Sequence, residues 1–191
     1  LVEIRAQFAM TQLELDNISR GCKDAEMDEL EKTVEKAARF EETLVYKGFE
    51  KGGMSGMLSS SQHDPVKLPA NASEYPQAVA KAVEQVDVSG VEGPYSLVLG
   101  PDQYYALLQD SKPGYPANRV VKDLIKGDII KSPVLEGGLL VSTRGGDFEL
   151  TVGKDFSIGY ASHDREKVEF FVTESLAFRV IDPRAAIALT A

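Results

Sequence analysis

The sequence predicts an α+β fold, and two stretches carry that prediction. Residues 27–48 place apolar side chains at the three- and four-residue spacing of one long amphipathic helix. Residues 168–180 instead alternate apolar and polar side chains, as in one long strand, and Glu174 is the only charged residue on the apolar face. A helix and a strand of this length in one chain indicate a mixed fold with a sizeable sheet.

The helix predicted at 27–48 carries its own start and stop signals. Asp28 and Glu31 have the spacing of a capping box, and Gly48 is a natural end. Asp28 and Lys32 lie one turn apart with opposite charges, as do Glu35 and Arg39. A helix of roughly 20 residues is about 30 Å long, so we expect it to lie along the edge of a sheet, beside the long final strand.

Shorter patterns fill the rest of the chain. They predict a strand at 1–10, a helical turn at 11–19, a helix at 75–86, a buried strand at 94–99, a helix carrying Tyr104, Leu107 and Leu108, a helix at 118–125, and short strands at 129–130 and 139–142. The turn at 144–147 predicts that 139–142 and 148–152 form a hairpin. Glycines and serines at 52–61 predict a flexible crossover between two lobes. Because the chain opens in mid-strand with Leu1, we expect that a front portion precedes it.

Composition excludes several function classes. Lys and Arg total 21 against 30 Asp and Glu, for a net charge of −9, and no basic cluster suggests a nucleic-acid surface. The one cysteine, Cys22, has no partner for an intramolecular disulfide, and no signal peptide or apolar run of membrane-spanning length is visible. A reducing cytoplasm is therefore the expected location. His63 and His163 lie in no metal, nucleotide or catalytic motif, so the residues predict neither a metal site nor an enzyme.

Four strings, in register over essentially the whole chain, resemble the encapsulin shell proteins of family 1, also called linocin-type bacteriocins. They are ELDNISRG at 14–21, GPYSLVL at 93–99, LEGGLLVSTRGGDFEL at 135–150, and GKDFSIGYASHDREKVEFFVTESLAFRV at 153–180. Family members carry an N-terminal helix and an extended loop in front of the position that corresponds to Leu1.

The resemblance implies a tailed-phage major-capsid fold of the Hong Kong 97 type. A peripheral domain would comprise residues 1–58 and 149–191, and an axial domain residues 59–148. About 60 copies, or a larger multiple, would form an icosahedral shell in the cytoplasm. The shell would enclose a cargo enzyme, such as an iron-storing ferritin-like protein or a dye-decolourising peroxidase, through the cargo's C-terminal targeting peptide. The alternatives are an antibacterial protein or hydrolase, as older family labels suggest, and a prophage capsid protein.

The resemblance also implies two sites without catalytic residues. A loop around the five-fold axis would line a pore with Lys112, Pro113, Gly114, Tyr115 and Pro116. A groove on the inner wall would hold the cargo peptide with Asp155, Phe156, Ser157, Ile158 and Tyr160, although the same alternation also fits a plain core strand. Some members stack a flavin on an aromatic residue just before ELDN, where this chain has Leu13. Of that site only Arg5 remains, so we expect no cofactor.

Overall fold

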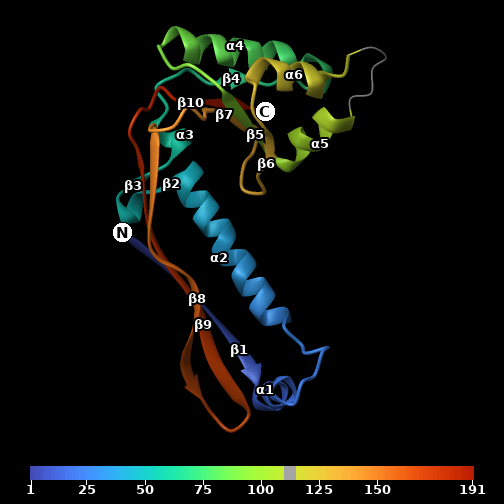
Figure 1. Cartoon of the computed structure of the whole chain (residues 1–191), viewed down its shortest axis with the longest axis vertical. Helices are drawn as coiled ribbons and strands as arrows, with labels where there is room; N and C mark the ends of the chain where they lie inside the picture. Colours follow the sequence, from blue (N-terminus) through green and yellow to red (C-terminus); the bar gives the residue numbers. More distant parts are fainter. Residues whose placement is uncertain (110–114) are drawn as a thin grey trace. The chain divides into compact units, whose positions relative to one another are not determined.

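The computed structural model describes residues 1–109 and 115–191, and the chain divides into two compact units (Figure 1). Unit 1 comprises Leu1–Thr43 and Leu150–Ala177, and unit 2 comprises Leu44–Glu149 and Phe178–Ala191. These bounds differ from those expected for the peripheral and axial domains, and that domain division stays a prediction.

Unit 1 is built on a three-stranded sheet in the order β1–β9–β8. The strands are β1 (Val2–Thr11), β8 (Phe148–His163) and β9 (Lys167–Val180), and the ends of β8 and β9 nearest Phe148 and Val180 belong to unit 2. β1 runs antiparallel to β9, with Val2 opposite Leu176 and Thr11 opposite Lys167. The long final strand predicted at 168–180 is confirmed. β8 is an edge strand, so one side of its backbone has no neighbour in the sheet.

Two helices complete unit 1. In α1 (Gln12–Ser19), Thr11 caps the start by accepting a hydrogen bond from the Glu14 amide at 3.2 Å. The predicted long helix is α2 (Asp28–Tyr46), whose last residues belong to unit 2, and the Glu35–Arg39 ion pair forms at 2.7 Å. Within unit 1, α2 buries Thr33 and Ala37 but leaves Val34 and Phe40 exposed. Part of its apolar surface is therefore not covered by the chain's own core.

Unit 2 is built on a five-stranded sheet in the order β4–β10–β7–β5–β6. The strands are β4 (Val66–Lys67), β5 (Tyr95–Leu99), β6 (Ile129–Lys131), β7 (Gly138–Ser142) and β10 (Ala186–Thr190). Every residue of β5 and β7 is buried, which explains their continuous apolar sequences. β4 and β10 were not predicted from the sequence.

Helices of unit 2 supply much of its core. They are α4 (Tyr75–Val88), α5 (Pro101–Gln109) and α6 (Ala117–Ile125), with the 3-10 turn η2 (Ala72–Glu74) before α4. Fully buried side chains from helices and sheet form one cluster that includes Val79, Val86, Leu97, Leu107, Val121, Ile125 and Ile187. The predicted helices at 75–86 and 118–125 are confirmed within a few residues.

The predicted hairpin of 139–142 with 148–152 is wrong. β7 lies between β5 and β10, with Leu140 opposite Leu97 on one side and Ile187 on the other. β8 is not a strand of this sheet and pairs with β9 instead. Every residue of β7 is buried, whereas β8 is mostly exposed. The two strands therefore lie in different environments and do not pair as a hairpin.

The flexible crossover predicted at 52–61 is also wrong. β2 (Gly48–Phe49) pairs with β3 (Met54–Ser55) around the 3-10 turn η1 (Glu50–Gly52), and α3 (Met57–Ser60) follows. A Cβ atom on Gly56 would lie 2.3 Å from the Gly48 nitrogen, so the two backbones touch. Here glycine marks a close approach of two backbone segments and not flexibility.

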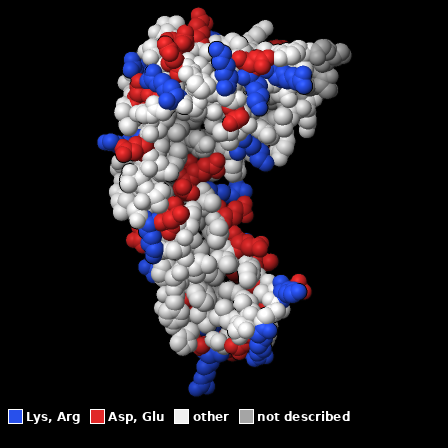
Figure 2. Space-filling model, viewed as in Figure 1, with Lys and Arg blue, Asp and Glu red and all other residues white. Residues whose placement is uncertain are grey.

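The surface charge is mixed. On the face shown in Figure 2, both acidic and basic side chains are spread over the surface, and no continuous basic patch is visible. None of the helices in the described ranges 1–109 and 115–191 is both long and apolar enough to cross a membrane.

Candidate functional site

The segment 155–160 on β8 exposes a row of large apolar side chains. Phe156, Ile158 and Tyr160 are 36%, 56% and 57% exposed. Gly159 faces the ring of Phe171 on β9, so its neighbours Ile158 and Tyr160 point to the other face of the sheet. In this chain the three side chains therefore do not belong to the core. Their role in holding a cargo peptide stays a prediction.

The polar side chains of the segment 155–160 either form a hydrogen bond to a residue nearby in the sequence or have no hydrogen-bond partner. The Asp155 Oδ1 atom accepts a hydrogen bond from the Phe156 amide at 2.7 Å. The Ser157 Oγ atom is buried without a hydrogen-bond partner. The Tyr160 hydroxyl and the His163 Nδ1 atom form a hydrogen bond at the end of the strand. Asp155 is exposed, so its carboxylate is accessible at the start of the segment.

The carboxylate of Glu174 in unit 1 is buried, and two other acidic side chains act on its charge. Glu174 on β9 is 2% exposed, and its Oε2 atom has no hydrogen-bond partner. Burial, and then the negative charges of Glu41 on α2 and Asp155 on β8, raise the pKa of Glu174. The sequence identified Glu174 as the one charge on an apolar face, but nothing in the local pattern brought Glu41 next to it.

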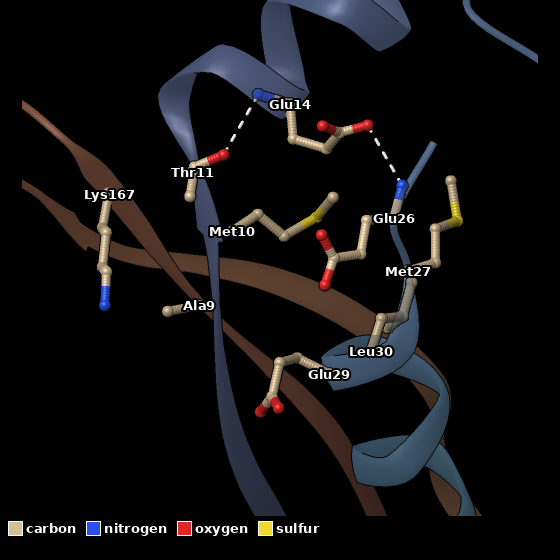
Figure 3. Close-up of a pocket in the computed structure, with 9 residues that line it drawn as sticks. All are labelled: Ala9, Met10, Thr11, Glu14, Glu26, Met27, Glu29, Leu30 and Lys167. Atoms are coloured by element: carbon tan, nitrogen blue, oxygen red, sulfur yellow. Dashed lines mark hydrogen bonds between the residues drawn. The ribbon is translucent and has the colours of Figure 1, made fainter. Parts of the chain in front are cut away.

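A separate pocket of about 350 Å³ in unit 1 was not predicted (Figure 3). Its lining comes from the end of β1, from α1, from the start of α2 and from Lys167 on β9, namely Ala9, Met10, Thr11, Glu14, Glu26, Met27, Glu29, Leu30 and Lys167. Glu14 holds the pocket wall together, because its Oε1 atom accepts a hydrogen bond from the Glu26 amide at 3.0 Å. The ELDN string therefore has a structural role in this chain.

The residues expected near a flavin site do not meet around a free ring. The guanidinium carbon of Arg5 lies 3.7 Å from the ring centroid of Phe171, so that ring is already covered. Leu13 is exposed and offers no aromatic surface. The absence of a cofactor stays a prediction.

Most of the predicted pore loop cannot be placed. Lys112, Pro113 and Gly114 lie outside the described residues. Tyr115 is 59% exposed, and its hydroxyl donates a hydrogen bond to Asp123, which raises the pKa of Tyr115. Pro116 stands at the N-cap of α6. The last two residues of the loop are thus anchored to α6 at the surface of unit 2, and their place in a pore stays a prediction.

Within the described residues, no group of three or more His, Cys, Asp or Glu side chains is arranged to hold a metal ion.

Solved structures show which fold this is. The chain superposes on a virus-like particle from Pyrococcus furiosus with a TM-score of 0.77 at 20% identity, covering 98% of this chain and 75% of that one. It superposes on the capsid of an empty GTA particle with a TM-score of 0.66 at 15% identity, covering 100% and 72%. Mycobacterium phage Che8 gives 0.64 at 10% identity, covering 98% and 70%. The fold is that of the Hong Kong 97 type capsid proteins, as predicted.

Sequence comparison shows the family. Residues 1–177 match the family described as encapsulating protein for peroxidase. A type 1 encapsulin shell protein of Rhodospirillum rubrum is 40% identical over 190 residues, which cover 99% of this chain and 68% of that protein. The type 1 encapsulin shell protein of Mycolicibacterium paratuberculosis is 36% identical over 190 residues, covering 100% and 72%. A diheme-cytochrome-encapsulin shell fusion protein of Kuenenia stuttgartiensis is 27% identical over 157 residues, covering 80% and 43%. This chain belongs to the encapsulin shell protein family.

Proposed function

We propose that this protein is the shell subunit of an icosahedral nanocompartment that assembles in the cytoplasm from about 60 copies or a larger multiple. The observation that carries the proposal is a capsid fold combined with similarity to encapsulin shell proteins along the whole chain. The subunit is a structural protein and not an enzyme. The antibacterial or hydrolase alternative would require activity in the isolated subunit, and none of the described side chains supplies a motif for it.

The shell encloses a cargo enzyme. Two similarities support an enclosed redox protein, since the family is described as encapsulating a peroxidase and one relative is a diheme-cytochrome-encapsulin shell fusion protein. A ferritin-like protein remains the second candidate cargo.

The cargo binds through an extended peptide on β8. An edge strand can accept a further strand through its free backbone groups, while alternate side chains supply specificity. Phe156, Ile158 and Tyr160 provide an exposed apolar row, and each anchor buried against it would contribute about 1.5–3 kcal/mol at best. Asp155 offers a carboxylate to a basic residue of the peptide.

The test is Ile158→Asp in the full-length gene product, coexpressed with a fluorescent reporter that carries the cargo's C-terminal peptide. We expect shells that form normally but contain little reporter, because a charge at this position must be desolvated when the peptide docks. Ile181→Asp is the matched control, since Ile181 is also exposed but lies on unit 2. It should leave loading unchanged.

Two results would overturn parts of this proposal. Shells of Ile158→Asp with normal loading would exclude β8 as the docking strand. Failure of shell formation in Ile158→Asp, with normal shells in Ile181→Asp, would assign Ile158 to a contact within the shell wall.

A further inference from the structure

Glu174 is a buried carboxylate of unit 1, and with the negative charges of Glu41 on α2 and Asp155 on β8 near it forms an acidic cluster, of which the shell proposed above uses only Asp155. Glu174 lies in the middle of β9, opposite Ile4 of β1, and is 2% exposed. An ionised carboxylate at such a position normally needs hydrogen bonds or a cation. The Oε2 atom of Glu174 has neither.

The neighbouring charges do not supply that cation. On α2, Glu42 adds a further negative charge beside Glu41, and Arg39 is paired with Glu35. On β1, Glu3 and Arg5 flank Ile4 and therefore point to the opposite face, where Arg5 covers Phe171. In the part of the chain that the structure describes, no Lys or Arg pairs with any of the three carboxylates, including Lys154 next to Asp155.

We propose that this cluster is a proton-operated lock, in which protonated Glu174 lets α2 pack on the sheet of unit 1 and ionisation of the cluster loosens that packing. Protonation removes the buried charge, and it gives Glu174 a hydroxyl donor that Glu41 or Asp155 can accept. Ionisation sets the buried charge of Glu174 against the negative charges of Glu41 on α2 and Asp155 on β8, and water screens the buried charge least.

The direction of the pH effect follows from the pKa shifts. Burial and neighbouring carboxylates raise the pKa of both Glu174 and Glu41 above the ordinary 4.5, so the folded chain binds more protons than the unfolded chain above that pH. The contribution of the cluster to stability is therefore complete below pH 4.5. It is lost as the pH rises from 4.5 through the raised values of the folded state.

Hydrogen exchange of the 191-residue chain at pH about 4 and about 8, corrected for the intrinsic rates, tests the lock. Peptides from Thr33–Thr43 and from 171–177 should lose protection at the higher pH, while peptides from the core of unit 2 serve as the reference. Glu174→Gln should raise protection of the α2 peptides at the higher pH by about fivefold or more and remove most of the pH dependence.

Two further variants keep the test decisive if the Glu174→Gln chain does not fold. Glu41→Gln removes one member of the cluster from α2 and should reduce the pH dependence. Glu31→Gln changes an exposed carboxylate on the same helix and should leave the pH dependence of α2 protection unaltered. Protection of α2 that does not depend on pH in the unmodified chain, or pH dependence equal in all variants, would overturn the proposal.

Discussion

Gly159 on β8 lies directly against the ring of Phe171 on β9, where a Cβ atom would come within 2.3 Å of the ring. The guanidinium of Arg5 lies over the same ring, 3.7 Å from its centroid. These contacts fix which face of β8 points toward Phe171. The neighbours of Gly159, Ile158 and Tyr160, point to the opposite face, where they are exposed.

Gly159→Ala should destabilise unit 1. The added methyl group must displace the Phe171 ring or the backbone of β8, and overpacking of this kind costs about 1–3 kcal/mol. Urea unfolding followed by circular dichroism measures the loss. Ala161→Ser, at an exposed position of the same strand, should change little. Equal stability of Gly159→Ala and the unmodified chain would contradict the packing described.

A network of two arginines and two aspartates ties together three connections of unit 2. The Arg144 guanidinium lies 2.7 Å from Asp147 and 3.2 Å from Asp182, and Arg184 lies 2.9 Å from Asp182. The same arginines donate hydrogen bonds to the carbonyl oxygens of Gly90 and Ser89 after α4. Through these hydrogen bonds and ion pairs, the network connects the end of α4 to the segments that follow β7 and β9.

Asp182→Asn should weaken unit 2 by about 1–2 kcal/mol at neutral pH, because hydrogen bonds to a charged group are lost. The hydrogen bond from Arg184, together with neighbouring positive charge, lowers the pKa of Asp182 below 3.8. The stabilisation is therefore present above pH 3.8 and is lost as the pH falls through the lowered value. The unfolding curves of Asp182→Asn and of the unmodified chain should converge in strong acid.

Asp64→Asn is the control for that experiment, since Asp64 is exposed on the same unit. A difference between Asp182→Asn and the unmodified chain that stays constant down to the lowest pH would show that the carboxylate charge is not what stabilises the network.

Tyr115→Cys should report on the predicted pore. If the loop at 112–116 surrounds a symmetry axis, neighbouring copies bring this position together, and a short bis-maleimide should crosslink assembled shells into closed oligomers. The substitution is made together with Cys22→Ser, because Cys22 is the only other cysteine and is exposed. A cysteine introduced by Glu166→Cys, at the β8–β9 turn, is the comparison. Crosslinking no greater at 115 than in unassembled subunits would place the loop away from an axis.

Local patterns predicted much of the fold because period and burial agree in its long elements. α2 and β9 have the repeats of a helix and a strand over many residues, and both lie where the repeats place them. β7 and β8 were paired wrongly because a turn between two short apolar runs is evidence for a hairpin only when no other strand competes for the same edge. β5 and β10 occupy both edges of β7.

The candidate sites show the same limit. Alternation along β8 predicted that Phe156, Ile158 and Tyr160 share one face, but only the structure shows that Gly159 contacts Phe171 and that all three side chains are exposed. The pairing of Glu41 with Glu174 joins residues more than a hundred positions apart, and the pocket around Glu14 joins β1, α1, α2 and β9. Such groupings depend on the tertiary fold, which a single sequence does not display.

The mass of the native full-length gene product tests the shell assignment most directly. Val34 and Phe40 on α2 and the apolar row of β8 are exposed in the single subunit, and contacts between copies would bury such side chains. Light scattering coupled to size exclusion should therefore find one large species of about 60 subunits or a larger multiple, with symmetric particles in electron micrographs. A monodisperse single subunit under native conditions would contradict the account. The 191 residues of this sequence have a mass of 20.8 kDa.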